Sequence, residues 1–322
     1  MKEAAFASAP ELSVIIPAYN ASKTIIKALT SLTDQTVSPD RWEIIVVDDG
    51  SNDDTRSLCA RFAEDHPNVR VVNQPNGDVS AARNRGISLA RGRWISFVDS
   101  DDCVTRDYVQ AMLSTAVDAD YVIFDHIDGD CASGKPWLKP WFDREVDISQ
   151  VLLWICDNRL NTPWDKRFSL SLIRDHGIRF PEGIHMGEDL LFNYRYARQA
   201  SSAYISARPV YRYVANDQSL TRKAVKPSRL REYEAVYHAM TEDCGPGPYR
   251  VATNLSYLRV IARYAGQLHL SGHSRRTIAD LLEGSSMVQA LLAEPTHSPK
   301  NILRKLLLRL RQYSLCARLF RN

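Results

Sequence analysis

Short apolar runs alternate with amphipathic segments along the first part of the chain. Runs rich in β-forming residues predict buried strands over residues 12–17, 42–47, 69–73, 94–98 and 121–124. Apolar residues at helical spacing predict intervening helices over residues 22–32, from a cap at 53 or 54 to 65, and over 80–90 and 106–117. Strands that alternate with helices of this length predict an α/β fold with a parallel sheet and right-handed crossovers.

The alternation ends after Asp128. Residues 128–160 are expected to form loops around one helix. The later segments are expected to form helices over 168–176 and 188–198, short strands over 203–205 and 210–214, and helices from Pro227 to the end. The C-terminal third therefore differs in kind from the α/β region before it.

Composition indicates a folded globular protein. The chain has 322 residues, of which 44% are hydrophobic, enough for a sizeable core. Its six cysteines form no CxxC pair and no regular spacing, so neither a disulfide framework nor a zinc site is indicated, and a reducing cytosol is expected. Without a signal-like apolar region or an apolar stretch of about 18 residues, we expect a chain that is neither secreted nor membrane-spanning.

Basic residues are concentrated toward the C-terminus. Residues 221–322 carry 17 Lys and Arg against 7 Asp and Glu, a charge of +10, which leaves −7 for residues 1–220. The end of the chain has seven basic residues and no acid: Lys300, Arg304, Lys305, Arg309, Arg311, Arg318 and Arg321. Interleaved apolar residues are expected to share one side of a helix: Ile302, Leu303, Leu306, Leu310, Tyr313 and Phe320.

This pattern in residues 300–322 is typical of a helix lying in an anionic membrane interface. The alternative is a terminal helix docked on its own domain, with a solvated basic face. Nucleic acid is a poorer partner, because no recognised binding motif accompanies the charge.

Polar residues follow each of the first four predicted strands. They are Tyr19 and Asn20, Asp48 and Asp49, residues 73–78, and residues 99–102. The carboxyl ends of strands in an open α/β sheet border the crevice where such folds bind ligands. Each group also has a structural explanation as a helix cap or turn, but their coincidence at four strand ends favours a ligand site.

The acidic residues between Asp99 and Asp102 indicate which kind of ligand binds at these strand ends. Clustered carboxylates repel one another unless a cation lies among them, and such oxygen ligands suit magnesium or manganese bridging a pyrophosphate. Asp48 and Asp49 can accept hydrogen bonds from a base or a ribose. A dinucleotide cofactor is disfavoured, because neither G-x-G-x-x-G nor a Walker A loop is present.

Four motifs occur in a fixed order along the chain: Pro17-Ala18-Tyr19-Asn20, Val47-Asp48-Asp49-Gly50-Ser51 with Asp53 and Thr55, Ala82-Arg83-Asn84-Arg85-Gly86, and Asp99-Ser100-Asp101-Asp102. Over residues 11 to about 125 this set resembles glycosyltransferase family 2, inverting nucleotide-sugar transferases with the GT-A fold. The resemblance implies a mostly parallel central sheet flanked by helices, with a helical C-terminal region. It also implies a flexible N-terminus at 1–10, a GT-A domain at 11–220 with a nucleotide-binding half (11–127) and an acceptor half (128–220), and a helical basic region at 221–322.

The resemblance further implies roles at the donor. Ala18, Tyr19 and Asp49 would hold uracil and ribose, Arg83 would support the nucleotide, and Asp99 and Asp101 would form the DxD element that meets sugar and metal. The whole expected donor set is Pro17, Ala18, Tyr19, Asn20, Asp48, Asp49, Arg83, Asp99, Ser100 and Asp101. The expected cofactor is Mg or Mn, held by Asp99 and Asp101.

One departure concerns the metal. Metal-using relatives often place a histidine after the strands of the second half, where this chain has the segment 211–219 without one. Arg212 or Arg222 contacting the diphosphate is the alternative.

A second part of the family pattern follows. Trp164-Asp165-Lys166 and Gly187-Glu188-Asp189-Leu190-Leu191-Phe192 resemble the W-x-K and E-D-x-x-F elements of bacterial members that build surface polysaccharides. Inverting transfer needs a base for the acceptor hydroxyl, a role that falls to Asp189, while Glu188 would hold the acceptor or orient the base. The structural alternative is that both acids merely favour the first turn of a helix. Trp164, Lys166 and Arg212 are expected on the acceptor side.

The predicted function is transfer of a hexose or N-acetylhexosamine from a UDP-sugar to a hydroxyl of a growing glycan. That glycan is a cell-surface, exo- or capsular polysaccharide, a teichoic acid or a lipid-linked oligosaccharide, and the expected location is the cytoplasm, peripheral on the inner face of the cell membrane. One alternative is a sugar nucleotidyltransferase, whose glycine-rich first loop is absent here. Another is a catalytically silent glycan-binding GT-A protein, which would lose acids that are present here. Trp137 and Trp141 either stack on acceptor sugars or belong to the core.

Overall fold

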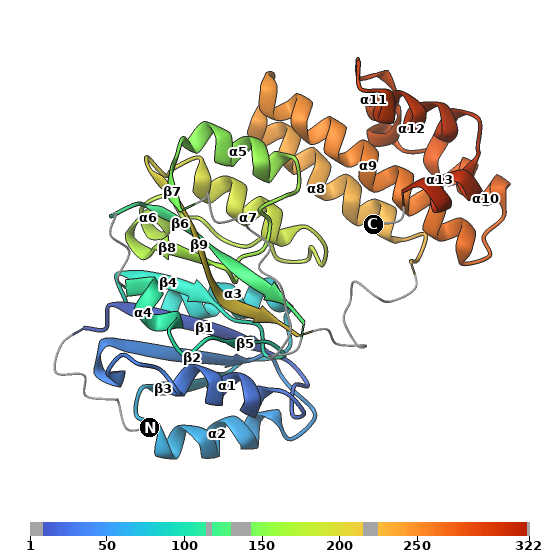
Figure 1. Ribbon diagram of the computed structural model, residues 1–322. Coiled ribbons are helices and arrows are strands. Elements are labelled where there is room, and N and C mark those ends of the chain that lie inside the picture. The colour runs from blue at the N-terminus through green and yellow to red at the C-terminus, as the bar shows by residue number, and fades with distance from the viewer. Residues whose placement is uncertain (1–8, 114–117, 130–142, 215–224, 321–322) are drawn as a thin grey trace. The chain divides into compact units, whose positions relative to one another are not determined.

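The computed structural model describes residues 9–113, 118–129, 143–214 and 225–320 (Figure 1). The chain divides into two compact units. Unit 1 comprises residues 1–151 and 162–217, and unit 2 comprises residues 152–161 and 218–322. Trp137, Trp141, Arg222, Arg321 and the expected boundary after residue 220 lie outside the described residues.

Unit 1 contains a nine-stranded sheet in the order β3-β2-β1-β4-β8-β6-β9-β5, with β7 paired to β9. The strands are β1 (Leu12–Ala18), β2 (Trp42–Asp48), β3 (Val69–Asn73), β4 (Trp94–Phe97), β5 (Cys103–Val104), β6 (Tyr121–Asp128), β7 (Arg144–Val146), β8 (Lys166–Ser169) and β9 (Ala203–Tyr213). The predicted α/β class is confirmed.

The first four strands of unit 1 form a parallel block. β1 pairs with β2 and β4, and β2 pairs with β3. Every residue of β1 and β2 is buried, which explains why these strands are nearly continuous apolar runs in the sequence. The register places Ala18 beside Asp48 and Asp48 beside Asn73, so the polar strand ends lie at one edge of the sheet.

Beyond β4 the sheet is mixed, because β8 is antiparallel to both β4 and β6. The prediction of a helix over 168–176 was wrong at its start: Phe168 and Ser169 belong to β8, and the helix begins at Leu170 after the Ser169 cap. The strand was not predicted because two charged residues, Lys166 and Arg167, interrupt its apolar pattern although both are buried. The two terminal nitrogens of Arg167 donate to the carbonyl oxygens of residues 112 and 119.

Three other strand predictions were incomplete. β9 is one strand, where two were expected over 203–205 and 210–214. Its pairing with β6 shifts register between residues 123 and 126, and such an irregularity accommodates the interruption around Pro209. β6 also extends to Asp128, and the short strands β5 and β7 were not predicted.

Helices connect and cover the strands of unit 1. They are α1 (Ile25–Thr33), the 3₁₀ turn η1 (Pro39–Arg41), α2 (Thr55–Asp65), α3 (Val79–Leu89), α4 (Tyr108–Leu113), α5 (Ile148–Cys156), α6 (Leu170–Asp175) and α7 (Glu188–Ala197). α5 is the one helix expected within 128–160, and it runs across the division between the units. α3 packs on β1 and β2, and this packing positions the third sequence motif.

Unit 2 is helical, as predicted beyond Pro227. Its helices are α8 (Arg229–Cys244), α9 (Pro248–Leu270), α10 (Arg275–Glu283), α11 (Ser286–Ala293), α12 (Pro299–Arg309) and α13 (Tyr313–Leu319). α13 approaches α9 closely at Gly266, where an added Cβ would lie 2.6 Å from the Ala317 nitrogen. No helix within the described ranges is both long and apolar enough to cross a membrane.

The contact between α3 and β1 yields a stability prediction. An alanine Cβ at Gly86 would lie 2.3 Å from Cγ2 of Ile15, a β-branched side chain with little freedom to move within a buried strand. We expect Gly86→Ala to lower the free energy of unfolding by about 1–3 kcal/mol in urea denaturation. Gly284→Ala is the control, because the nearest atom to its Cβ is 3.4 Å away. Equal stability of the two variants would contradict the tight packing.

Candidate active site

Asp49 lies in a fixed orientation at the end of β2. Its Oδ1 accepts hydrogen bonds from Gln74 Nε2 at 2.7 Å and from the Gly77 amide at 3.0 Å. Asn76 Nδ2 donates to the Asp49 carbonyl oxygen at 2.9 Å. The turn needs Gly50, whose φ is +73° and whose added Cβ would lie 2.7 Å from the Asn76 nitrogen. The loop after β3 thus holds the acid that was predicted to bind the nucleoside.

The other residues of the first two motifs divide between exposed and buried positions. Tyr19 is 50% exposed, and Asn20 beside it has a φ of +49° and is joined to the second motif through the Ser51 hydroxyl. Pro17 and Ala18 are buried within β1. Asp48 is 2% exposed, and its Oδ1 has no hydrogen-bond partner among the described residues. This oxygen is itself buried, so it offers no surface to a ligand in this arrangement.

Arg83 of α3 holds carboxylates from two other parts of the chain. Its Nη1 donates to Asp189 Oδ1 at 2.6 Å and lies 3.5 Å from Glu188 Oε1, while its Nη2 donates to Asp99 Oδ1 at 3.2 Å. The Arg83 side chain is 5% exposed, against 29% for Asp99 and 27% for Asp189. The structure therefore brings together the predicted donor residue Asp99 and the predicted base Asp189.

The charges of this cluster do not balance. Three ionised carboxylates against one guanidinium leave a net charge of −2. Burial raises the pKa of Asp189 to about 8; Arg83 opposes the rise, and the Glu188 and Asp99 carboxylates add to it. The cluster therefore favours binding of a proton or of a further cation.

The backbone places Glu188 and Asp189 at the first turn of α7. Gly187, the residue before them, has a φ of +92°, a left-handed conformation that glycine adopts readily. Asn193 Nδ2 donates to the Asp189 carbonyl oxygen at 2.8 Å, one turn further along the helix. The first turn of a helix favours acidic residues, which was the structural alternative given from the sequence. The contacts with Arg83 exist in addition to this favourable position.

α3 also positions the loop that leads to α7. Asn84 Nδ2 donates to the Phe180 carbonyl oxygen, and Asn84 Oδ1 accepts from the Phe180 amide, each at 2.9 Å. Asp78 caps α3 through the Ala81 amide and also accepts from the Gly183 amide at 2.7 Å. The roles of Asn84 and Asp78 in the loop were not predicted, although Asn84 lies inside the third motif.

The turn after β4 is braced by Tyr211. The Tyr211 hydroxyl donates to Asp102 Oδ2 at 2.7 Å and accepts from the Asp99 amide at 3.1 Å. Asp102 Oδ1 accepts from the Val214 amide at 2.7 Å. Burial raises the pKa of Asp102 to about 8, and the Asp99 charge adds to the rise, against the two hydrogen bonds. Asp102 is thus buried and hydrogen-bonded within the protein, whereas Ser100 and Asp101 are partly exposed.

The residues expected on the acceptor side are largely buried. Trp164 is 6% exposed and stacks on Tyr211, with ring centroids 4.3 Å apart. Lys166 is fully buried, pairs with the Asp165 carboxylate and donates to the Thr162 carbonyl oxygen at 2.5 Å. In this arrangement Trp164 and Lys166 offer no surface to an acceptor. Instead, Trp164 supports the tyrosine that braces the Asp99 turn.

Arg212 follows Tyr211 in β9 and is partly buried, beside Cys103 in the register with β5. No three acidic, histidine or cysteine side chains in the described part of the chain are grouped so that they could hold a metal ion. The predicted ligands Asp99 and Asp101 would supply two carboxylates. Such a pair fits Mg²⁺, which is usually held by one or two carboxylates together with water and substrate phosphates.

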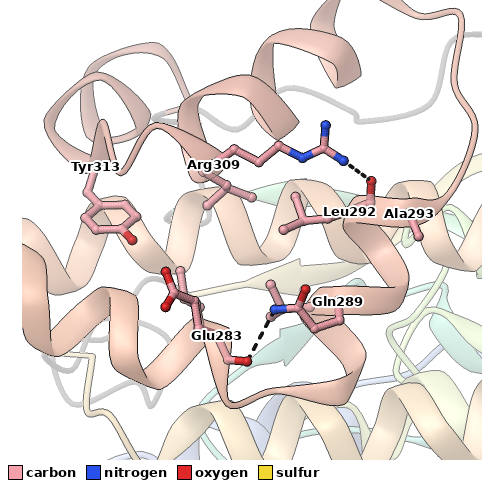
Figure 2. Close-up of a pocket in the computed structure, with 9 residues that line it drawn as sticks. Glu283, Gln289, Leu292, Ala293, Arg309 and Tyr313 are labelled. Carbon is pink, nitrogen blue, oxygen red and sulfur yellow. Dashed lines mark hydrogen bonds between the residues drawn. The ribbon is translucent and has the colours of Figure 1, made fainter.

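A separate pocket of about 360 Å³ lies within unit 2. Figure 2 shows Arg309 at this pocket, with its guanidinium donating to the Leu292 carbonyl oxygen at 3.0 Å. The lining is mainly apolar, with side chains from α10, α11, α12 and α13. None of the predicted site residues lines this pocket.

Comparisons with known proteins agree with the sequence motifs. The family model described as "Glycosyl transferase family 2" matches residues 13–170. The putative glycosyltransferase EpsH of Bacillus subtilis (strain 168) is 31% identical over 237 residues, covering 67% of this chain and 64% of EpsH.

Solved structures show the same fold at low sequence identity. Residues 1–349 of S. aureus TarS, in a complex with UDP-GlcNAc, superpose with a TM-score of 0.66 at 20% identity, over 96% of this chain and 90% of that one. The mannosyltransferase PcManGT from Pyrobaculum calidifontis, in complex with GDP-Man and Mn²⁺, superposes with a TM-score of 0.55 at 20% identity, over 97% and 87%. The predicted GT-A fold is confirmed.

The charge imbalance around Arg83 yields a second prediction. Arg83→Met keeps much of the side-chain volume but leaves three carboxylates without their cation, so we expect a loss of about 3 kcal/mol in the free energy of unfolding. The loss should grow as pH rises, because the carboxyl groups that a proton would neutralise then ionise. Urea unfolding at two pH values measures both effects. The neighbouring exposed Arg85→Met is the control, and an equal effect of both variants would refute the role of Arg83.

Proposed function

This chain belongs to glycosyl transferase family 2 through residues 13–170, and from this membership we propose that it transfers a hexose or N-acetylhexosamine from a UDP-sugar to a glycan hydroxyl. The observation that carries the proposal is the cluster at Arg83. This guanidinium contacts Asp99, on the predicted donor side, and Asp189, the predicted base. An acid that binds the donor and an acid that activates the acceptor must lie on either side of one anomeric carbon.

Asp189 is the proposed general base. Its carboxylate takes the proton of the acceptor hydroxyl while that oxygen forms a bond to the anomeric carbon. The bond from this carbon to the diphosphate oxygen breaks on the opposite face, so the configuration inverts and the electron pair leaves with UDP. A pKa of about 8 suits a base that must accept a proton near neutral pH, and Glu188 beside it would orient the base or hold the acceptor.

Asp49 is the proposed main contact for the nucleoside. The hydrogen bonds from Gln74 and Gly77 fix its carboxylate before the donor arrives, which lowers the entropy cost of binding. Ala18 and Tyr19 would lie against the base. The UDP-GlcNAc in the TarS complex supports a uridine donor, whereas the GDP-Man in the PcManGT complex makes a guanosine donor the alternative. UDP and GDP release across a panel of nucleotide sugars distinguishes the two.

Asp99 and Asp101 would hold Mg²⁺ or Mn²⁺, which neutralises charge on the departing diphosphate when it is bound. Asp99 is fixed by Tyr211 at its amide and by Arg83 at its carboxylate. The Mn²⁺ in the PcManGT complex supports this assignment. Arg212, on the strand that carries Tyr211, is the proposed protein cation near the diphosphate.

The proposed acceptor is a growing surface glycan, either free or linked to a lipid. The relationship to the poly(ribitol-phosphate) beta-glucosyltransferase of Bacillus spizizenii, 28% identical over 212 residues, supports a surface-polymer acceptor. We place the reaction in the cytoplasm, at the inner face of the cell membrane, where nucleotide-sugar donors and lipid-linked acceptors meet.

The assignment of the base yields a third prediction. Asp189→Asn removes the proton acceptor but keeps the size and most of the contacts of the side chain. We expect transfer to fall by about 100-fold or more, the range for loss of a general base, while UDP affinity in calorimetry stays near that of the wild type. Asp175→Asn, an exposed acid at the end of α6, is the control. Near-normal turnover by Asp189→Asn would remove this residue from the mechanism.

The metal assignment yields a fourth prediction. Asp101→Ala should weaken donor binding, and a chelator should reduce UDP release by the wild-type protein, because both remove charge compensation from the diphosphate. Adding Mn²⁺ back should restore the chelated wild type but not the variant. If the chelator has no effect, protein cations such as Arg212 carry this charge and the family's metal is not used here.

A further inference from the structure

Helix α12 has apolar residues on its outer face. Ile302, Leu306 and Leu310, at its C-cap, are 50%, 49% and 57% exposed, whereas Asn301 and Lys305 are only 6% and 9% exposed. A surface helix normally has the reverse arrangement, with its apolar side toward the core. Leu303 of α12 is 38% exposed, and Leu315 and Leu319 of α13 are 38% and 55% exposed. Together with Ile302, Leu306 and Leu310 they are called the outer apolar face.

The inward polar residues are satisfied, so this orientation is stable. Lys305 Nζ donates to the Leu292 carbonyl oxygen at 3.2 Å and also to that of Glu294. Asn301 Oδ1 accepts from Arg304 at 2.6 Å. Leu307 and Leu308 are buried, and α12 packs on α9. The helix is therefore docked on its own unit, and the outer apolar face is left over after docking.

The structure corrects the sequence-based assignment of this face. Tyr313 is 1% exposed and lies in the pocket of Figure 2 instead. Phe320 is covered by the Arg304 guanidinium, 4.8 Å from its ring centroid. The alternative of a terminal helix docked on its own domain is thus confirmed in part, because the terminal helices dock on unit 2 but present an apolar outer face rather than only a solvated basic one. Membrane binding stays a prediction.

Exposed cations lie in the same terminal segment as the outer apolar face. Lys300, Arg309, Arg311 and Arg318 are exposed, and residues 300–320 include no acid. Glu283 neutralises Arg311 through a contact of 2.7 Å, which leaves the other three exposed charges. Arg309 donates to the Leu292 carbonyl oxygen at 3.0 Å, which holds its guanidinium in place (Figure 2).

We propose that the outer apolar face of α12 and α13 docks on an anionic lipid bilayer. The leucines would enter the boundary between headgroups and acyl chains, and the exposed basic side chains of this segment would contact anionic headgroups. This inference deepens the proposed function, because docking on a bilayer would bring the enzyme to a lipid-linked acceptor. Its relevance to transfer rests on the proposed function.

Charge favours lipid over a second copy of the chain. A two-fold interface would place the same basic terminal segment of both copies against each other, which repels. An anionic headgroup layer instead complements a basic segment with an apolar face. Salt should therefore weaken the docking.

Flotation of the full chain with vesicles tests this surface. We expect binding to phosphatidylglycerol–phosphatidylcholine vesicles and weaker binding to phosphatidylcholine alone. The variant Ile302→Ser/Leu306→Ser/Leu310→Ser should bind anionic vesicles about tenfold or more weakly, because three apolar side chains leave the interface. Val251→Ser/Leu270→Ser, at exposed apolar positions on α9, is the matched control and should bind as the wild type does. Lys300→Gln/Arg318→Gln should reduce binding to anionic vesicles only.

Two results would overturn the proposal: no vesicle binding by the wild type, or equal binding by the triple serine variant. Light scattering addresses self-association, since a dimer that the triple variant disperses, without vesicle binding, would assign the face to a second copy. UDP release with a water-soluble acceptor should be the same in the wild type and the triple variant. Absence of UDP release in the wild type would count against the proposed transferase reaction and not against lipid docking.

Discussion

The arrangement of the site depends on the ion pairs that Arg83 forms with Asp99 and Asp189. The Arg83 guanidinium is buried and binds carboxylates from the end of β4 and from the start of α7, segments about ninety residues apart. One positive charge cannot compensate three carboxylates, and the remaining negative charge raises the affinity for protons and cations. Burial is the main cause of the raised pKa of Asp189, and the Glu188 and Asp99 charges add to the rise against Arg83. The excess negative charge would also suit a metal–diphosphate group at the Asp99 turn.

The rest of unit 1 keeps Arg83 in place. Gly86 allows α3 to lie directly against Ile15 of β1, and Asn84, one residue beyond Arg83, ties the loop at Phe180 to the same helix. Three positions of one short motif therefore determine the distance between helix and sheet, the charge at the site and the path of the chain into α7. Tyr211, stacked on Trp164, fixes the turn at Asp99 from the other side.

Much of this architecture could be predicted where local pattern and burial agree. β1 to β4 are mainly apolar strands with polar ends, so the polar edge of the sheet that carries Asp49 and Asp99 could be predicted from the sequence. β8 could not be found in the same way, because Lys166 and Arg167 are charged yet buried, and groups such as Asp165 and the carbonyl oxygens of residues 112 and 119 compensate them. The brace from Tyr211 to Asp102 and the tie from Asn84 to Phe180 depend on contacts over about one hundred residues, which periodicity does not encode.

The dependence of kcat/KM on pH, measured as UDP release, tests the central claim that Asp189 is a base whose pKa is set by burial in an uncompensated acidic cluster. This quantity reports ionisation in the free enzyme, and the base must be ionised to accept a proton. The account predicts a rise of about tenfold per pH unit up to a plateau above about pH 8, where the pKa of Asp189 lies. A profile that is already flat from about pH 5 upward would contradict it, because Asp189 would then titrate as an ordinary exposed aspartate.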